Sequence, residues 1–229
     1  KNLTMLRKAG QSAICSAWSP GAVPKCGAHL PRPAKNGSGV SAVHPLPGPA
    51  GGRRGQRNWS LTPEDYGNFL CTLFDEWYRD WEQGRYTSVR LFDDYVHLAM
   101  GLPPSTCATG GHCGAYFVVE ADGGVYPCDF YVLDEWKMGN LHETPLAELK
   151  NSPRAQEFLE KGNRRPAECA GCPWHYLCFG GCKRDWTAGA DGDTRNYYCP
   201  AFRRFFAYAE PRLRRIAAAE TAARRGVQV

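Results

Sequence analysis

Eight of the eleven cysteines in this chain follow one spacing pattern: C-x5-C-x14-C, then forty further residues, then C-x2-C-x5-C-x3-C-x16-C. Cysteine thiolates in groups of four hold either a structural zinc ion or an iron–sulfur cluster. Eight of them therefore provide two complete sites of this kind. The cysteines of the pattern are Cys107, Cys113, Cys128, Cys169, Cys172, Cys178, Cys182 and Cys199.

A disulfide framework is the other way in which a chain uses so many cysteines. Disulfide scaffolds are usually short secreted domains, whereas this chain has 229 residues and shows no export signal. It is hydrophilic, with a mean hydropathy of −0.48, and it has no apolar run of the roughly 18 residues that a membrane span needs. We therefore expect a cytoplasmic protein whose thiols stay reduced and bind metal.

The first part of the chain differs in composition from the rest. Residues 1–63 contain nine Lys or Arg and no Asp or Glu, and they are rich in Pro, Gly, Ala and Ser. Such a segment buries too little apolar surface to offset its chain entropy, so we predict disorder over about residues 11–57. The basic residues do not alternate with aromatic ones, which argues against nucleic-acid binding.

Regular apolar periodicity begins after Trp59. Thr62 and Pro63, followed by two acidic residues, form a typical helix start, and apolar residues then recur at three- and four-residue spacing up to Gly84. This pattern predicts a core helix. Further helix starts are predicted at Thr144-Pro145, at Ser152-Pro153 and near Ala201.

A β-hairpin is predicted between the second and third cysteines of the pattern. Residues 115–121 and 125–132 are rich in β-branched and aromatic side chains, and Asp122-Gly123-Gly124 between them is a turn sequence. The turn would bring Cys113, just before the hairpin, close to Cys128 on the return strand.

These elements predict an α+β fold in which a hairpin and short helices surround the cysteine sites, flanked by an N-terminal amphipathic helix and a C-terminal helix. The predicted divisions are a disordered or out-of-frame basic segment at 1–58 and a helical linker at 59–106. A cysteine-rich domain at 107–199 and a C-terminal helix and tail at 200–229 follow.

The cysteine order and its surroundings resemble the SPASM domain, the auxiliary-cluster module at the C-terminus of a group of radical SAM enzymes. More narrowly, they resemble the anaerobic sulfatase-maturating enzymes. The resemblance covers about residues 59–206. The phrases that carry it are VEADGGVYPCD at 119–129, MGN at 138–140, CFGGC at 178–182 and NYYC at 196–199.

The resemblance implies two 4Fe-4S clusters whose ligands interleave along the sequence. Spacing alone would suggest a simpler division, so the interleaving comes from the family. Structural zinc stays an alternative, because zinc also accepts four thiolates and spacing does not distinguish the two kinds of site. Cluster I would take Cys107, Cys113, Cys128 and Cys182, and cluster II would take Cys169, Cys172, Cys178 and Cys199.

The family resembled here oxidises a Cys or Ser side chain of a sulfatase to formylglycine. A separate cluster cleaves S-adenosylmethionine (SAM), the adenosyl radical takes a hydrogen atom from the target, a base removes a proton, and the auxiliary clusters accept the electron. Asp129 matches the position of the family's proposed base, a role that suits a positioned carboxylate; capping of the hairpin is its alternative role. The implied partners are a sulfatase or other peptide substrate and a reductant such as ferredoxin or flavodoxin, with no nucleic acid and no membrane.

The chain departs from the family where SAM is bound. The C-x3-C-x2-C triplet of the SAM-cleaving cluster is absent, and Cys15 and Cys26 cannot form it. No strand–helix–strand succession typical of the radical SAM barrel is visible either, so we interpret residues 1–58 as an out-of-frame or degraded remnant.

We expect this chain alone to bind neither SAM nor a third cluster, to carry electrons and help to bind a peptide, and to be inactive as an enzyme. Two alternatives stay open. One is a non-enzymatic interaction module stapled by zinc, and the other is the SPASM part of a different radical SAM peptide-modifying enzyme.

Overall fold

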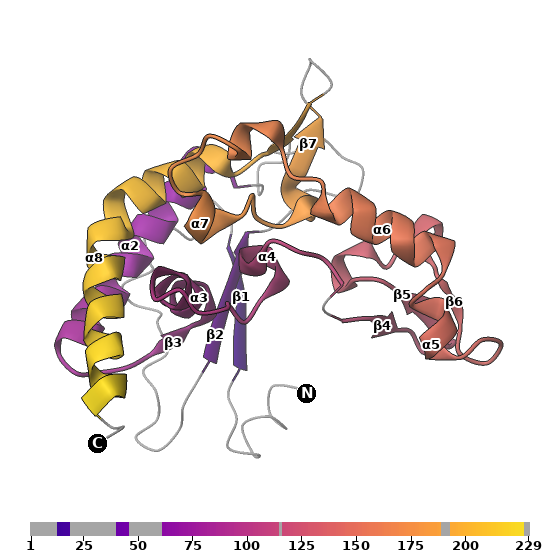
Figure 1. Ribbon diagram of the computed structural model, residues 1–229, viewed down its shortest axis with the longest axis horizontal. Helices are drawn as coiled ribbons and strands as arrows, with labels where there is room; N and C mark the ends of the chain where they lie inside the picture. Colours follow the sequence, from indigo (N-terminus) through magenta and orange to yellow (C-terminus); the bar gives the residue numbers. More distant parts are fainter. Residues whose placement is uncertain (1–12, 19–39, 46–60, 115, 189–192, 227–229) are drawn as a thin grey trace. The chain divides into compact units, whose positions relative to one another are not determined.

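The computed structural model describes residues 13–18, 40–45, 61–114, 116–188 and 193–226 (Figure 1). The chain divides into two compact units. Unit 1 comprises Lys1–Ser105 together with Tyr197–Val229, and unit 2 comprises Thr106–Asn196. The described residues form helices and small separate sheets, which agrees with the expected α+β class.

Unit 1 is organised around helix α2 (Pro63–Glu82), which begins where the sequence predicts. The side chain of Thr62 accepts a hydrogen bond from the backbone N–H of Asp65 at 3.1 Å, and Pro63 occupies the first helical turn. These features satisfy backbone donors that have no partner within the helix. The predicted apolar stripe is buried except for Trp81, which is partly exposed.

An aromatic core joins α2 to helices α3 (Arg90–Ala99) and α8 (Cys199–Gly226). The ring centroids of Phe74, Phe92 and Tyr95 each lie 5.6 Å from that of Phe205, whose side chain is fully buried. Helices α2 and α8 run side by side, as Figure 1 shows. Aromatic burial is therefore the main source of cohesion in unit 1.

A parallel sheet in unit 1 differs from our expectation for the first part of the chain. Strands β1 (Ala13–Trp18), β2 (Val40–Pro45) and β3 (Ser88–Val89) pair in that order, with Val40 opposite Ser88. The succession β2–α2–β3 is a strand–helix–strand crossover, which sequence analysis did not recognise. Parallel pairing joins segments that are far apart in sequence, so no local pattern predicts it. The Pro- and Gly-rich composition around β1 and β2 also led us to predict disorder instead of strands. The rest of the 1–58 prediction lies outside the described residues.

Unit 2 contains the predicted hairpin, in a shorter form. Strands β4 (Val118–Val119) and β5 (Gly124–Tyr126) pair antiparallel, and β6 (Gly139–Asn140) pairs with the other side of β5. Gly123 adopts a φ of 82° in the turn, a conformation that favours glycine. The return strand ends at Tyr126 rather than at residue 132, because Pro127 lacks the N–H that a ladder needs. Cys128 therefore follows the strand instead of lying on it.

The remaining elements of unit 2 are short. Helix α6 (Pro153–Asn163) begins as predicted, with Ser152 accepting a hydrogen bond from the backbone N–H of Ala155 at 3.2 Å. The predicted start at Thr144-Pro145 corresponds to α5, whose first residue is Leu146. The others are α4 (Cys107–Gly110), α7 (His175–Cys178), 3-10 helices η2 (Asp129–Tyr131), η3 (Asp134–Trp136), η4 (Ala167–Cys169) and η5 (Lys183–Asp185), and the paired strands β7 (Trp186–Ala188) and β8 (Thr194–Asn196).

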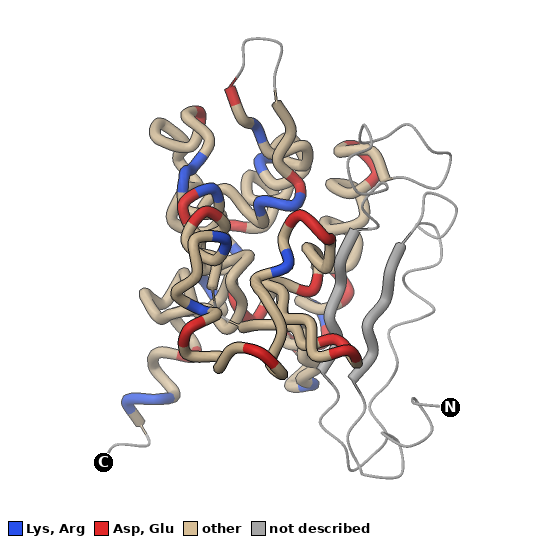
Figure 2. Tube along the Cα trace, turned by 90° about the vertical axis from the view of Figure 1, so that its right-hand side faces the viewer, with Lys and Arg blue, Asp and Glu red and all other residues tan. Residues whose placement is uncertain are grey.

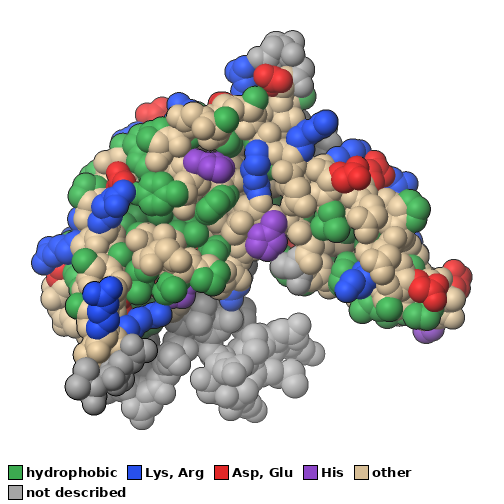
Figure 3. Space-filling view, in the orientation of Figure 1, with side chains coloured by type: hydrophobic (Ala, Val, Ile, Leu, Met, Phe, Trp, Pro, Cys, Tyr) green, Lys and Arg blue, Asp and Glu red, His purple; other side chains and the backbone are tan. Residues whose placement is uncertain are grey.

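Charged residues of both signs are interspersed along the described trace (Figure 2). Basic side chains recur along α8 and can be followed on its outer surface in Figure 3. None of the helices among the described residues combines the length and the apolar run that crossing a membrane requires.

The aromatic core predicts the effect of truncating Phe205. We expect Phe205→Ala to lower the free energy of unfolding by about 3–5 kcal/mol, because a fully buried ring leaves a cavity that its neighbours fill only in part. Urea denaturation monitored by tryptophan fluorescence measures this. Phe202→Ala is the matched control: Phe202 lies one turn earlier in α8 and is partly exposed, so its loss should be smaller. Equal losses would contradict the assignment of Phe205 to the centre of the core.

Candidate metal centres

Four cysteines of the pattern lie in unit 2 at the ends of short elements. Cys107 begins α4, Cys113 follows the same helix, Cys128 precedes η2 and Cys182 precedes η5. All four are free thiols and partly buried. They are the residues predicted for cluster I.

The fold brings these four thiols into mutual electrostatic contact. Cys107 influences the ionisation of both Cys113 and Cys182, and Cys182 in turn influences Cys128. The four residues span positions 107–182 of the sequence, so only folding gathers them. The grouping of Cys182 with the three N-terminal cysteines stays a prediction, and Cys182 follows Cys178 by only four residues.

Burial is the dominant influence on the ionisation of these thiols. It raises the pKa of Cys113, and it raises the pKa of both Cys128 and Cys182 to about 12. Thiols in such surroundings keep their protons unless a cationic centre replaces them, and metal binding releases protons for this reason. The donor set fits a thiolate-bound metal group, whose positive metal ions would offset the cost of burying the sulfur charges.

Glycine and tyrosine residues shape the surroundings of cluster I. A Cβ added at Gly162, near the end of α6, would lie 2.5 Å from the Sγ of Cys113, so only glycine fits there. The hydroxyl of Tyr116 lies 4.0 Å from the Sγ of Cys107 and donates to the carboxylate of Asp129 at 3.5 Å. That carboxylate also lies 3.3 Å from the Sγ of Cys128. Asp129 is exposed, beside the thiol of Cys128.

A second group of cysteines in unit 2 surrounds a glycine turn. Cys169 ends η4, Cys172 follows it and Cys178 ends α7. Gly180, with a φ of 82°, lies so close that an added Cβ would be 3.3 Å from the Sγ of Cys169. Its carbonyl accepts hydrogen bonds from Trp186 Nε1 at 2.9 Å and Asn196 Nδ2 at 2.8 Å, and these two bonds fix the turn to the β7–β8 pair.

The eighth cysteine lies in the other unit. Cys199 is the first residue of α8 and belongs to unit 1. The proposed grouping of Cys199 with Cys169, Cys172 and Cys178 therefore stays a prediction. Among the described residues, no three His, Cys, Asp or Glu side chains are placed to share a single metal ion.

Two cations at the thiols were not predicted. Arg165 interacts electrostatically with Cys113, Cys169 and Cys178, and burial lowers its pKa. Burial also lowers the pKa of Lys183 to about 8, against the opposing influence of the neighbouring thiols. Sequence reasoning missed both because nothing in the local pattern distinguishes a buried basic residue from a solvated one.

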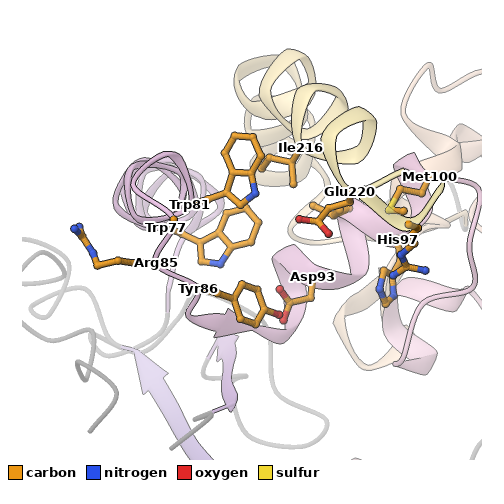
Figure 4. Close-up of a pocket in the computed structure, with 12 residues that line it drawn as sticks. Trp77, Trp81, Arg85, Tyr86, Asp93, His97, Met100, Ile216 and Glu220 are labelled. Carbon is orange, nitrogen blue, oxygen red and sulfur yellow. The ribbon is translucent and has the colours of Figure 1, made fainter. Parts of the chain in front are cut away.

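Unit 1 contains a separate pocket of about 460 Å³ (Figure 4). Trp77, Trp81 and Tyr86 form aromatic walls, and the carboxylates of Asp93 and Glu220 face the space between them. Burial raises the pKa of Asp93. The sequence did not predict this pocket, because its residues come from separate segments between positions 77 and 224.

Part of unit 2 matches a known domain family. Residues 111–173 match the SPASM model, described as an iron–sulfur cluster-binding domain. The matched range includes Cys113, Cys128, Cys169 and Cys172, and the other four cysteines of the pattern lie outside it.

Curated proteins match a longer part of the chain. It is 43% identical over 165 residues to the cysteine-type anaerobic sulfatase-maturating enzyme of Clostridium perfringens (strain 13 / Type A). It is 36% identical over 157 residues to the serine-type anaerobic sulfatase-maturating enzyme of Bacteroides thetaiotaomicron. These matches cover 72% and 67% of the chain but 45% and 37% of the relatives, so the chain spans less than half of their length.

The chain is also similar to solved structures of anSMEcpe. The structure of native anSMEcpe with bound AdoMet has a TM-score of 0.79 and 35% identity, covering 90% of this chain and 57% of that one. Native anSMEcpe with bound AdoMet and Cp18Cys peptide also has a TM-score of 0.79. That match covers 90% of this chain and 58% of the anSMEcpe chain. The structural match covers a larger share of the chain than the sequence match does.

The fold and its thiols therefore define a class: the chain carries a SPASM iron–sulfur cluster-binding domain. Over the part of their length that it spans, it is homologous to the anaerobic sulfatase-maturating enzymes, which are radical SAM proteins.

The close approach of Gly162 to Cys113 generates a prediction. Helix propensity alone would favour Gly162→Ala by about 1 kcal/mol, but the added Cβ would displace the Cys113 thiol. We expect the variant to lose the metal bound by the Cys113 group, measured by metal analysis of the purified chain.

Gly171→Ala is the matched control, because an added Cβ there meets nothing within 4 Å. This control should keep its full metal content. Full metal content in Gly162→Ala as well would contradict the prediction, because it would show that the Cys113 thiol can move away from the added Cβ and still bind metal.

Proposed function

We propose that this chain holds two 4Fe-4S clusters and acts as the electron-accepting, peptide-contacting part of a sulfatase-maturating radical SAM protein. Cluster I takes Cys107, Cys113, Cys128 and Cys182, and cluster II takes Cys169, Cys172, Cys178 and Cys199. The convergence of four distant thiols within unit 2 is the observation that carries this proposal. Their reduced state suits the cytoplasm, where we place the protein.

The reaction proposed for the complete system is the oxidation of a Cys or Ser side chain of a sulfatase to formylglycine. Its first stage removes two electrons and two hydrogens from the side chain: one hydrogen atom goes to an adenosyl radical, one proton to a base and one electron to an acceptor. When bound, the clusters supply a one-electron acceptor. The radical source belongs to a C-x3-C-x2-C site, which these 229 residues do not contain.

Asp129 is the base that we propose for the proton. Its carboxylate is exposed and lies within reach of both Tyr116 and the cluster I ligand Cys128, so a peptide side chain approaching the cluster also approaches Asp129. A general base must lie within hydrogen-bond distance of the proton that it removes. The partners are a sulfatase peptide and a reductant such as ferredoxin or flavodoxin; the similar structure of anSMEcpe holds a Cp18Cys peptide.

Metal analysis separates this proposal from a zinc-stapled interaction module. After anaerobic reconstitution with iron and sulfide, we expect about eight irons and eight sulfides per chain, with a broad absorbance near 400 nm, because each 4Fe-4S cluster uses four thiolates. Iron, zinc and acid-labile sulfide are measured on the same sample. Two zinc ions per chain with no visible absorbance would replace the proposal with the structural module.

Single cysteine variants test the interleaved ligand sets. Cys128→Ala and Cys172→Ala should each lose one cluster, and electron paramagnetic resonance of each reduced variant then records the cluster that is left. We expect Cys182→Ala to give the spectrum of Cys128→Ala, since both belong to cluster I. A spectrum like that of Cys172→Ala would assign Cys182 to cluster II and contradict the interleaving.

Two controls accompany these variants. Cys71→Ala removes a thiol of unit 1 outside the pattern and should keep both clusters. Asp129→Asn should also keep all eight irons, because we assign Asp129 to proton transfer and not to iron. Loss of iron from Asp129→Asn would indicate a structural role for the carboxylate.

A further inference from the structure

Lys183 is a buried cation inside an aromatic cage. Its Nζ lies 3.2 Å from the ring centroid of Phe158, 4.9 Å from that of Tyr131 and 5.0 Å from that of Trp136. The ammonium group also donates a hydrogen bond to the backbone carbonyl of Phe158 at 3.0 Å, and the residue is only 9% exposed. Aromatic faces attract an ammonium ion, most strongly when water is excluded. The charge is thus held at a defined position.

This cation lies beside cluster I. Lys183 directly follows Cys182 in the sequence, and its charge interacts with the thiols of Cys113, Cys128 and Cys182. The side-chain stem passes close to Cys113: a Cβ added at Gly162 would lie 3.3 Å from Cδ of Lys183 and 2.5 Å from the Sγ of Cys113. Three of the four predicted ligands therefore lie near enough to this ammonium group to interact with its charge.

The charge of Lys183 needs a counter-charge. A buried ammonium ion costs several kcal/mol unless an opposite charge or polar groups offset the loss of water. The ion pairs of the described residues include none between Lys183 and an Asp or Glu. The neighbouring cysteines supply a counter-charge once they bind a metal centre as thiolates, because a cluster with four thiolate ligands is a net anion.

We propose that Lys183 sets the reduction potential of cluster I by placing one fixed positive charge beside it. The inference rests on the proposed function, because it requires that Cys107, Cys113, Cys128 and Cys182 hold a redox-active cluster. Reduction adds one electron and makes the cluster more negative. A neighbouring cation stabilises the reduced form more than the oxidised form and so raises the potential, which nearby charge and hydrogen bonding are known to control.

Neighbouring cations do not share this position. Lys161 also approaches the Trp136 ring, at 5.3 Å, but its side chain is 61% exposed and forms an ion pair with Glu157 at 2.7 Å. Arg165 interacts with Cys113 alone of the cluster I thiols. Arg184 also acts on Cys182, but its charge is paired with that of Asp185 at 3.5 Å. We therefore assign the unpaired positive charge beside this cluster to Lys183, and Lys161 offers a matched control of the same residue type.

The test is a redox titration of the reconstituted full chain, followed by electron paramagnetic resonance. Lys183→Met keeps the apolar stem, and Lys183→Gln keeps a donor for the Phe158 carbonyl; both remove the charge. At the midpoint potential of cluster I in the parent chain, we expect the ratio of reduced to oxidised cluster to fall at least about tenfold, which corresponds to about 59 mV for one electron. Cluster II serves as an internal reference and should keep its midpoint, as should both clusters in Lys161→Gln.

Lys183→Arg retains a charge and should restore most of the parent ratio. Loss of iron from both neutral variants with full loading of Lys183→Arg would overturn the proposal, since the charge would then be needed for binding the cluster and not for its potential. An unchanged midpoint in fully loaded neutral variants would overturn it and leave the proposed function intact. Loss of iron from all three variants would overturn it in favour of a purely structural side chain, and a parent chain without redox-active clusters would overturn both proposals.

Discussion

The burial of cysteine thiols within residues 106–196 is the constraint on which the rest of that unit depends. Burial holds the pKa values of Cys113, Cys128 and Cys182 above their ordinary value, so these groups stay protonated until a metal centre replaces the protons. One apolar cluster of the unit comprises Val125, Met138, Leu149 and Ala155. Short helices and two- or three-residue strands need another source of cohesion, and in our proposal a cluster that joins four distant thiols is that source.

Unit 1 is stabilised in a different way. Helices α2, α3 and α8 bury a group of aromatic rings, and the ion pair of Asp75 with Arg212 at 2.7 Å joins α2 to α8. The chain thus combines a unit that packing stabilises with one whose cysteines, in our proposal, depend on iron and sulfide.

The homology to the sulfatase-maturating enzymes and the geometry of unit 2 point to the same chemistry. The chain spans 45% of the cysteine-type relative, and the part that it spans contains cysteines of the kind that ligate iron–sulfur clusters. The exposed carboxylate of Asp129 and the buried ammonium group of Lys183 both interact with the thiol of Cys128. We propose that the first receives a proton and that the second adjusts how readily the cluster accepts an electron.

The sequence by itself determined those features whose cause is local. The cap and apolar stripe of α2, the turn at Gly123 and the cysteine spacing all depend on residues close together in the chain. Tertiary structure alone decided the rest: the pairing of β2 with β3, the early end of the hairpin, and the meeting of Lys183 with thiols from three segments. Pairing and burial depend on partners tens of residues away, and no local pattern records them.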